Sequence, residues 1–192
     1  MNYFSLFNLP VQYHLNPKTL KQLYIQQAQE AHPDYYMQTE AETQQIVLET
    51  SAQINKAYNT LANPQKRLEH ILQLYQLLDD NSNIPSPNLT TSFPRKRESQ
   101  LSQQFLMEML EINELIEELK QNPNPKSLTE TQSQIDNLLN TNQQQIETHL
   151  QTFDTLTDEA LRKEKLTIVL KFYLEQKYLL RLCESLSNFA PA

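Results

Sequence analysis

Apolar residues recur at three- and four-residue spacing along most of the chain, which is the period of an amphipathic α-helix. The first apolar stripe predicts a helix that begins near Asn16, a residue suited to cap it, with Pro17 at its first position. This helix ends before Pro33. A second stripe runs from about Glu40 to Leu61, and Asn63-Pro64 opens a shorter third one. The pattern predicts two long antiparallel helices with short flanking helices over residues 1–78.

Residues 79–99 interrupt the periodicity with three prolines and many Ser, Asn and Thr residues, which is typical of a linker. Beyond it the pattern predicts three helices with short connections, at roughly 100–121, 127–152 and 157–188. Short connections favour antiparallel neighbours. The predicted fold class is therefore all-α, with a helical domain at 1–78, a linker at 79–99 and a C-terminal three-helix bundle at 100–190.

Composition narrows the possible functions. The chain contains no glycine, the residue that tight hairpins and phosphate-binding loops use, so nucleotide-binding α/β folds and most β-architectures are disfavoured. The net charge is −7, and residues 101–192 carry −6 of it, which argues against a nucleic-acid partner. The single cysteine, Cys183, fits a reducing cytoplasm. Neither a membrane-spanning apolar run nor a signal peptide is expected.

The loop between the first two predicted helices contains His32-Pro33-Asp34. Pro33 restricts the backbone, so His32 and Asp34 project a donor and an acceptor in a fixed relation. A plain turn that caps a helix end is the alternative interpretation. We expect no enzyme activity, because no nucleophile, cofactor loop or pair of carboxylates in an apolar setting accompanies the two side chains. The four histidines and Cys183 have no metal-ligand spacing, so neither metal nor cofactor is expected.

The predicted helix that follows the linker has apolar residues on two sides. Its core stripe consists of Leu101, Phe105, Met109, Ile112, Ile116 and Leu119. Leu106 and Leu110 lie outside that stripe, beside Met107 and the acids Glu111, Glu114 and Glu118. From the residues alone, this second side either packs on another part of the protein or binds a partner.

Three sequence matches support a resemblance to a known family. The tripeptide between two helices, followed by a segment from Ile54 to Arg67 that reads INKAYNTLANPQKR, resembles the J-domain. The opening YFSLFNLP and the segment FLMEMLE at 105–111 resemble the HscB family, J-proteins of iron–sulfur cluster assembly, whose fold is a J-domain followed by a helical bundle.

The resemblance implies that the first domain stimulates the ATPase of an HscA-like Hsp70. The implied Hsp70-binding residues are His32, Pro33, Asp34, Lys18, Lys21, Lys56, Lys66 and Arg67. The chain departs from the usual J-domain in two ways. Its first long helix has only two lysines, and Tyr35 stands where a lysine commonly follows the tripeptide, so charge steering should be weaker.

The resemblance also implies that the bundle binds an IscU-like iron–sulfur scaffold. The implied residues are Leu106, Met107, Leu110, Glu111, Glu114, Glu118 and one aromatic, Tyr173 in preference to Phe172. The expected function is a co-chaperone that delivers the scaffold to Hsp70. A J-domain protein with another client, or a helical interaction module without a chaperone role, are the alternatives.

Overall fold

The computed structural model describes residues 1–78 and 101–188, and within these ranges every regular element is a helix. The chain divides into two compact units. The first comprises Met1–Asp80 and Phe153–Thr155, and the second Asn81–Thr152 and Leu156–Ala192. The linker predicted at 79–99 lies outside the described residues, and the predicted domain boundaries on either side of it stay a prediction.

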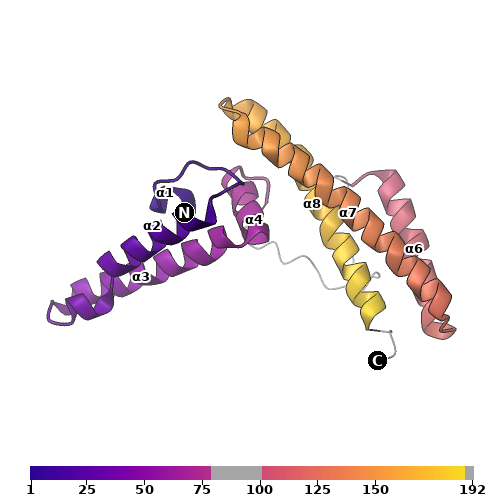
Figure 1. The fold of residues 1–192 in the computed structure, drawn as a ribbon, viewed down its shortest axis with the longest axis horizontal. Helices are drawn as coiled ribbons and strands as arrows, with labels where there is room; N and C mark the ends of the chain where they lie inside the picture. Colours follow the sequence, from indigo (N-terminus) through magenta and orange to yellow (C-terminus); the bar gives the residue numbers. More distant parts are fainter. Residues whose placement is uncertain (79–100, 189–192) are drawn as a thin grey trace. The chain divides into compact units, whose positions relative to one another are not determined.

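The first unit is built on an antiparallel pair of helices, α2 (Pro17–Glu30) and α3 (Ala41–Ala62), as Figure 1 shows. The side chain of Asn16 caps α2 by accepting hydrogen bonds from the amides of Lys18 and Thr19, and Pro17 occupies its first turn. The short helices α1 (Tyr3–Leu6) and α4 (Pro64–Leu74) pack against α3. The two long helices predicted from the apolar period are therefore confirmed.

The α2–α3 pair is held together by a narrow apolar seam. Leu20 on α2 and Ile54, Ala57 and Leu61 on α3 are buried. The rings of Tyr24 and Tyr58 stack at 4.2 Å between centroids across the pair. Ile46 on α3 lies outside this seam. Its side chain is mostly exposed because it lies about 100° around α3 from the buried Val47.

The second unit contains α6 (Gln103–Gln121), α7 (Pro125–Thr155) and α8 (Glu159–Ser187). Its core joins the predicted stripe of α6 to apolar residues of the other two helices: Met109, Ile112, Ile116, Leu119, Ile135, Leu179, Leu182 and Leu186. The helix predicted at 127–152 extends to Thr155, three residues past its predicted end. The Thr152 hydroxyl donates to the Thr148 carbonyl, so this residue continues the helix instead of ending it.

No described helix is both long and apolar enough to cross a membrane. The absence of glycine leaves two described non-glycine residues with positive φ, Asn8 (53°) and Gln76 (58°). Both lie just after a helix, where the chain turns through the left-handed region. Asparagine tolerates that region well, and glutamine does so at a modest energetic cost.

Candidate functional site

The His-Pro-Asp turn is a short 3-10 helix, η1 (Pro33–Tyr36), between α2 and α3. His32 is its N-cap, and its ring Nδ1 accepts a hydrogen bond from the backbone amide of Asp34 at 3.3 Å. Pro33 follows at the first helical position, where a missing amide costs nothing. The local sequence therefore specifies the turn by a side-chain cap and a fixed proline φ.

This capping bond defines how the two polar side chains are presented. Because Nδ1 accepts, the neutral His32 ring carries its proton on Nε2, the nitrogen that makes no capping bond. His32 Nδ1 and Asp34 Oδ2 are 3.7 Å apart, and both side chains are at least half exposed. A donor and a carboxylate therefore stand side by side on an accessible turn.

The turn is braced from both neighbouring helices. The Tyr36 hydroxyl donates to the carbonyl of Glu30 at the end of α2, at 3.1 Å. The side-chain amide of Gln44, in the first turns of α3, donates to the carbonyls of Met37 (3.1 Å) and Thr39 (2.9 Å). These bonds fix the backbone on either side of the tripeptide, so little conformational entropy remains to be lost when a partner binds.

The four predicted lysines are exposed but do not gather at the turn. Lys18 and Lys21 lie in the first half of α2, and Lys21 is about 14 Å of helix length before its last residue. Lys56 and Lys66 line a hollow of about 850 Å³ with residues of α1, α3 and α4. Lys56 lies about 22 Å along α3 from the end that follows the turn. The structure therefore separates these lysines from His32.

Arg67 was predicted to bind Hsp70, and the structure corrects this. Its side chain is only 8% exposed, and its guanidinium donates to the backbone carbonyls of Leu61 and Tyr13. Burial lowers the pKa of Arg67, while Tyr13 and Asp154 raise it. Arg67 thus satisfies buried carbonyls inside the first unit and is a structural residue.

The second predicted surface is accessible on α6. Met107 and Leu110 are 60% and 54% exposed, Leu106 is half-buried, and the three acids of the surface are exposed. At 100° per residue they share one side of α6, opposite the core stripe. Met107 and Glu111 also line an open hollow of about 660 Å³ with Gln103, Gln104 and Glu108. Sequence reasoning missed the two glutamines, although their i−4 and i−3 spacing from Met107 is visible in the sequence.

Tyr173 was preferred as the aromatic of this surface, and the structure corrects this too. Its side chain is 3% exposed, because α8 directs it into the bundle. Its neighbour Phe172 is half-buried, stacks on the His149 ring at 5.9 Å and lies 5.8 Å from Lys171 Nζ. Phe172 is therefore the accessible aromatic of the pair.

Glu175, two residues after Tyr173, is also buried. Its carboxylate accepts a hydrogen bond from Asn142 at 3.2 Å and lies 3.9 Å from Lys171 Nζ. Burial raises the pKa of Glu175, and Lys171 and Asn142 oppose this only in part. The Oδ1 atom of Asn142 is buried without a hydrogen-bond partner. This polar pair between α7 and α8 is imperfectly satisfied and therefore costs the bundle stability.

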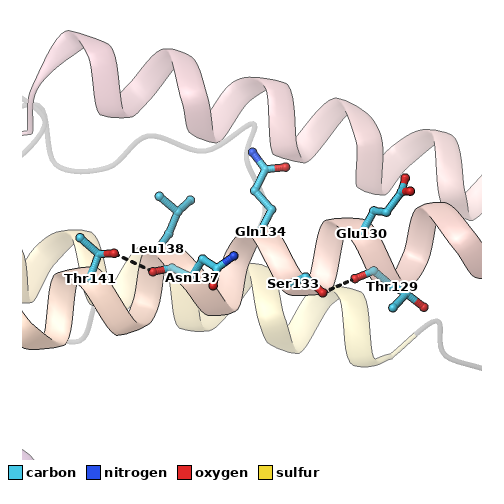
Figure 2. A pocket seen from close by; sticks show the side chains of 7 residues that line it. All are labelled: Thr129, Glu130, Ser133, Gln134, Asn137, Leu138 and Thr141. Atoms are coloured by element: carbon cyan, nitrogen blue, oxygen red, sulfur yellow. Dashed lines mark hydrogen bonds between the residues drawn. The ribbon is translucent and has the colours of Figure 1, made fainter.

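Other features of the described residues do not form a reactive site. Figure 2 shows an open hollow of about 480 Å³ whose seven lining residues all project from α7. The Ser133 and Thr141 hydroxyls in it donate to carbonyls of their own helix, so they are not positioned as nucleophiles. Within residues 1–78 and 101–188, no three His, Cys, Asp or Glu side chains could hold a metal ion together. Burial raises the pKa of Cys183, which makes it a poor thiolate.

Comparison with known proteins matches both units. Residues 101–187 match the family model described as the HSCB C-terminal oligomerisation domain. Curated relatives named co-chaperone protein HscB homolog include those of Colwellia psychrerythraea (33% identical over 62% of this chain), Shewanella halifaxensis (30% over 66%) and Aliivibrio salmonicida (31% over 66%). The matches cover 61%, 65% and 66% of those proteins, less than two thirds of each.

Solved structures extend the likeness to the whole fold. The chaperone HscB from Vibrio cholerae aligns with a TM-score of 0.56 at 22% identity, over 98% of this chain and 96% of that one. Human co-chaperone protein HscB aligns with a TM-score of 0.57 at 20% identity, over 98% and 81%. A helical hairpin with an exposed His-Pro-Asp turn, followed by a helical bundle, defines a J-domain protein with a C-terminal helical domain. The chain is similar to the HscB family over both units, and residues 101–187 match the model of its C-terminal domain.

Replacing Arg67 tests its structural role. We expect Arg67→Ala to lower the free energy of unfolding of the first unit by about 2–4 kcal/mol, because two buried carbonyls lose their donor. The neighbouring exposed Lys66→Ala should change it by less than about 0.5 kcal/mol. Urea unfolding followed by circular dichroism measures both, and equal effects of the two substitutions would contradict the assignment.

Replacing Glu175 tests the cost of its burial. A raised folded-state pKa means that Glu175 favours folding below the pKa of an unfolded glutamate, and that this contribution is lost as pH rises through the folded value. Glu175→Gln should therefore be more stable than wild type at pH 7.5, by about 1 kcal/mol, and the difference should vanish towards pH 4. Thermal unfolding across pH measures this. Exposed Glu164→Gln is the control, and a destabilised Glu175→Gln at pH 7.5 would contradict the prediction.

Proposed function

We propose that this protein is a cytoplasmic co-chaperone that stimulates the ATPase of an HscA-like Hsp70 and delivers an IscU-like iron–sulfur scaffold to it. In this proposal the protein performs no chemistry of its own. ATP hydrolysis takes place on the Hsp70, and any iron–sulfur cluster is carried by the scaffold. The protein contributes two binding surfaces, one on each unit.

The observation that carries the proposal is the accessible, braced His-Pro-Asp turn. An imidazole ring and a carboxylate, with His32 Nδ1 and Asp34 Oδ2 3.7 Å apart on a pre-ordered turn, suit recognition by a large partner, because binding need not order the loop. If the Hsp70 contacts this turn only when the Hsp70 is in its ATPase-active arrangement, binding shifts the Hsp70 towards that arrangement. Stimulation would then be allosteric, with a size set by the difference in affinity for the two Hsp70 states.

The outer side of α6 supports the second half of the proposal. Met107 and Leu110 form an apolar centre, and Glu111, Glu114 and Glu118 surround it with negative charge. Exposed apolar anchors ringed by polar residues are the usual form of a protein–protein interaction site. We assign this side of α6 to the scaffold. Phe172 on α8 takes the place of Tyr173 as the proposed aromatic contact, because it is the accessible one.

The first test concerns the two ring nitrogens of His32. We expect His32→Gln to abolish stimulation in single-turnover ATP hydrolysis by the cognate Hsp70, because glutamine cannot cap η1 as the ring Nδ1 does. His32→Asn places an oxygen near the position of Nδ1, so it should keep the cap and retain more stimulation than His32→Gln. Circular dichroism must stay helical in both.

The outcomes of this test separate the possible roles of His32. Equal and complete loss of stimulation in both variants would mean that the outward Nε2–H group is required, and not the cap made by Nδ1. Unchanged stimulation in His32→Gln would refute the proposed mechanism. Stimulation that is intact while scaffold binding is absent would point instead to a J-domain protein with another client.

The second test concerns the α6 surface. We expect Leu106→Ala with Leu110→Ala to weaken binding of the scaffold at least about tenfold, because two apolar anchors of the interface are lost. Leu115→Ala with Leu180→Ala removes two other exposed leucines of the same bundle and is the matched control. Isothermal titration calorimetry measures both. Equal affinities of the two double variants would remove Leu106 and Leu110 from the site.

A further inference from the structure

The charge around the His-Pro-Asp turn has an unusual sign for a J-domain, given that the resemblance implies a basic Hsp70-binding face. From Gln22 to Asn55 the chain contains no lysine or arginine. The same stretch contains five acids, at Glu30, Asp34, Glu40, Glu42 and Glu49, and all five are exposed. An acidic partner surface would be repelled here, and Lys18 and Lys21 are too far along α2 to offset that repulsion at the turn.

Two large apolar side chains project from the same turn. Tyr35 follows Asp34 directly and is 76% exposed, and Met37 ends η1 and is 70% exposed. Apart from Met1 they are the most exposed large apolar side chains among the described residues. The Tyr35 ring lies edge-on to the His32 ring, at 5.8 Å between centroids. Apolar surface is therefore continuous with the tripeptide.

The exposure of these side chains does not reflect a loose loop. The Tyr35 amide donates to the His32 carbonyl at 3.1 Å, and the Met37 carbonyl accepts from Gln44 of α3. The backbone that carries both side chains is thus fixed to the helices. An aromatic ring and a flexible thioether on a fixed backbone are well suited to fill an apolar recess of a partner.

We propose that Tyr35 and Met37 are specificity-determining contacts with the Hsp70 ATPase domain, and that they select an Hsp70 whose docking face is apolar and not acidic. This inference rests on the proposed function and deepens it. The partner is argued from two features: continuity with the His-Pro-Asp turn, and the absence of lysine and arginine from the stretch Gln22 to Asn55 that forms the turn and the adjoining parts of its flanking helices. An Hsp70 with an acidic docking face would bind more weakly for two reasons. Its charge would be repelled by the acids around the turn, and it would offer no apolar recess for Tyr35 and Met37.

The test compares variants of the full chain in single-turnover ATP hydrolysis by the cognate Hsp70. We expect Tyr35→Ala with Met37→Ala to raise the concentration required for half-maximal stimulation about tenfold, because two anchors are truncated. Leu161→Ala with Leu180→Ala, which removes exposed apolar surface from α8, should leave that concentration unchanged. Circular dichroism and thermal unfolding verify that each variant is folded.

A charge insertion makes the test decisive. Tyr35→Lys restores the cation that commonly follows the tripeptide in J-domains. If the docking face is apolar, the variant should require about tenfold more protein for half-maximal stimulation of the cognate Hsp70, while its stimulation of an Hsp70 with an acidic docking face should improve. Improved stimulation of the cognate Hsp70 by Tyr35→Lys would overturn the inference.

The same assay distinguishes failure of the inference from failure of the proposed function. Absence of stimulation by wild type, or a His32→Gln variant as active as wild type, would refute the proposed function. Stimulation that depends on His32 but is unaffected by Tyr35→Ala with Met37→Ala would refute only the inference.

Discussion

The geometry of the candidate Hsp70 site depends on one local constraint, the closure of the turn between α2 and α3 without a glycine. The ring of His32 accepts the Asp34 amide, and Pro33 contributes a φ already suited to the first turn of η1. The Tyr36 hydroxyl and the Gln44 side chain then satisfy carbonyls on either side. The residues proposed to recognise a partner are thus the residues that close the turn. A substitution at His32 therefore alters both the cap of η1 and the proposed partner contact. Only a residue that replaces one ring nitrogen and not the other can separate these two roles.

Much of this organisation follows from periodicity and caps. Asn16-Pro17 and Asn63-Pro64 begin helices where side-chain caps and a proline at the first position predict them. The α6 core stripe is the predicted one because a helix of this length can bury only one side against its neighbours. The failures have a common cause. Arginine is mostly exposed in proteins and tyrosine is of intermediate burial, so the burial of Arg67 and Tyr173 is decided by their tertiary neighbours.

The polar contacts of Arg67 and of the buried Glu175 involve residues distant in sequence. Arg67 donates to the carbonyl of Tyr13, 54 positions earlier, and Glu175 accepts from Asn142, 33 positions earlier. No local pattern encodes such a pairing. The choice between Phe172 and Tyr173 shows the same limit. The apolar period alone does not determine, to within one residue, which side of α8 faces the bundle. Phe172 and Tyr173 are 100° apart on the helix, and that single step decides which aromatic a partner can reach.

The two candidate surfaces use the same kind of chemistry. At the turn, the exposed Tyr35 and Met37 have acidic residues nearby. On α6, the exposed Met107 and Leu110 do as well. In both places apolar contact would supply affinity, while negative charge would restrict which partners can approach. A chain with a net charge of −7, and with no lysine or arginine from Gln22 to Asn55, would not rely on attraction to an acidic partner at the turn. Its selectivity would then rest on apolar shape complementarity, which salt does not screen, and on repulsion of like charge, which salt weakens as it weakens long-range steering.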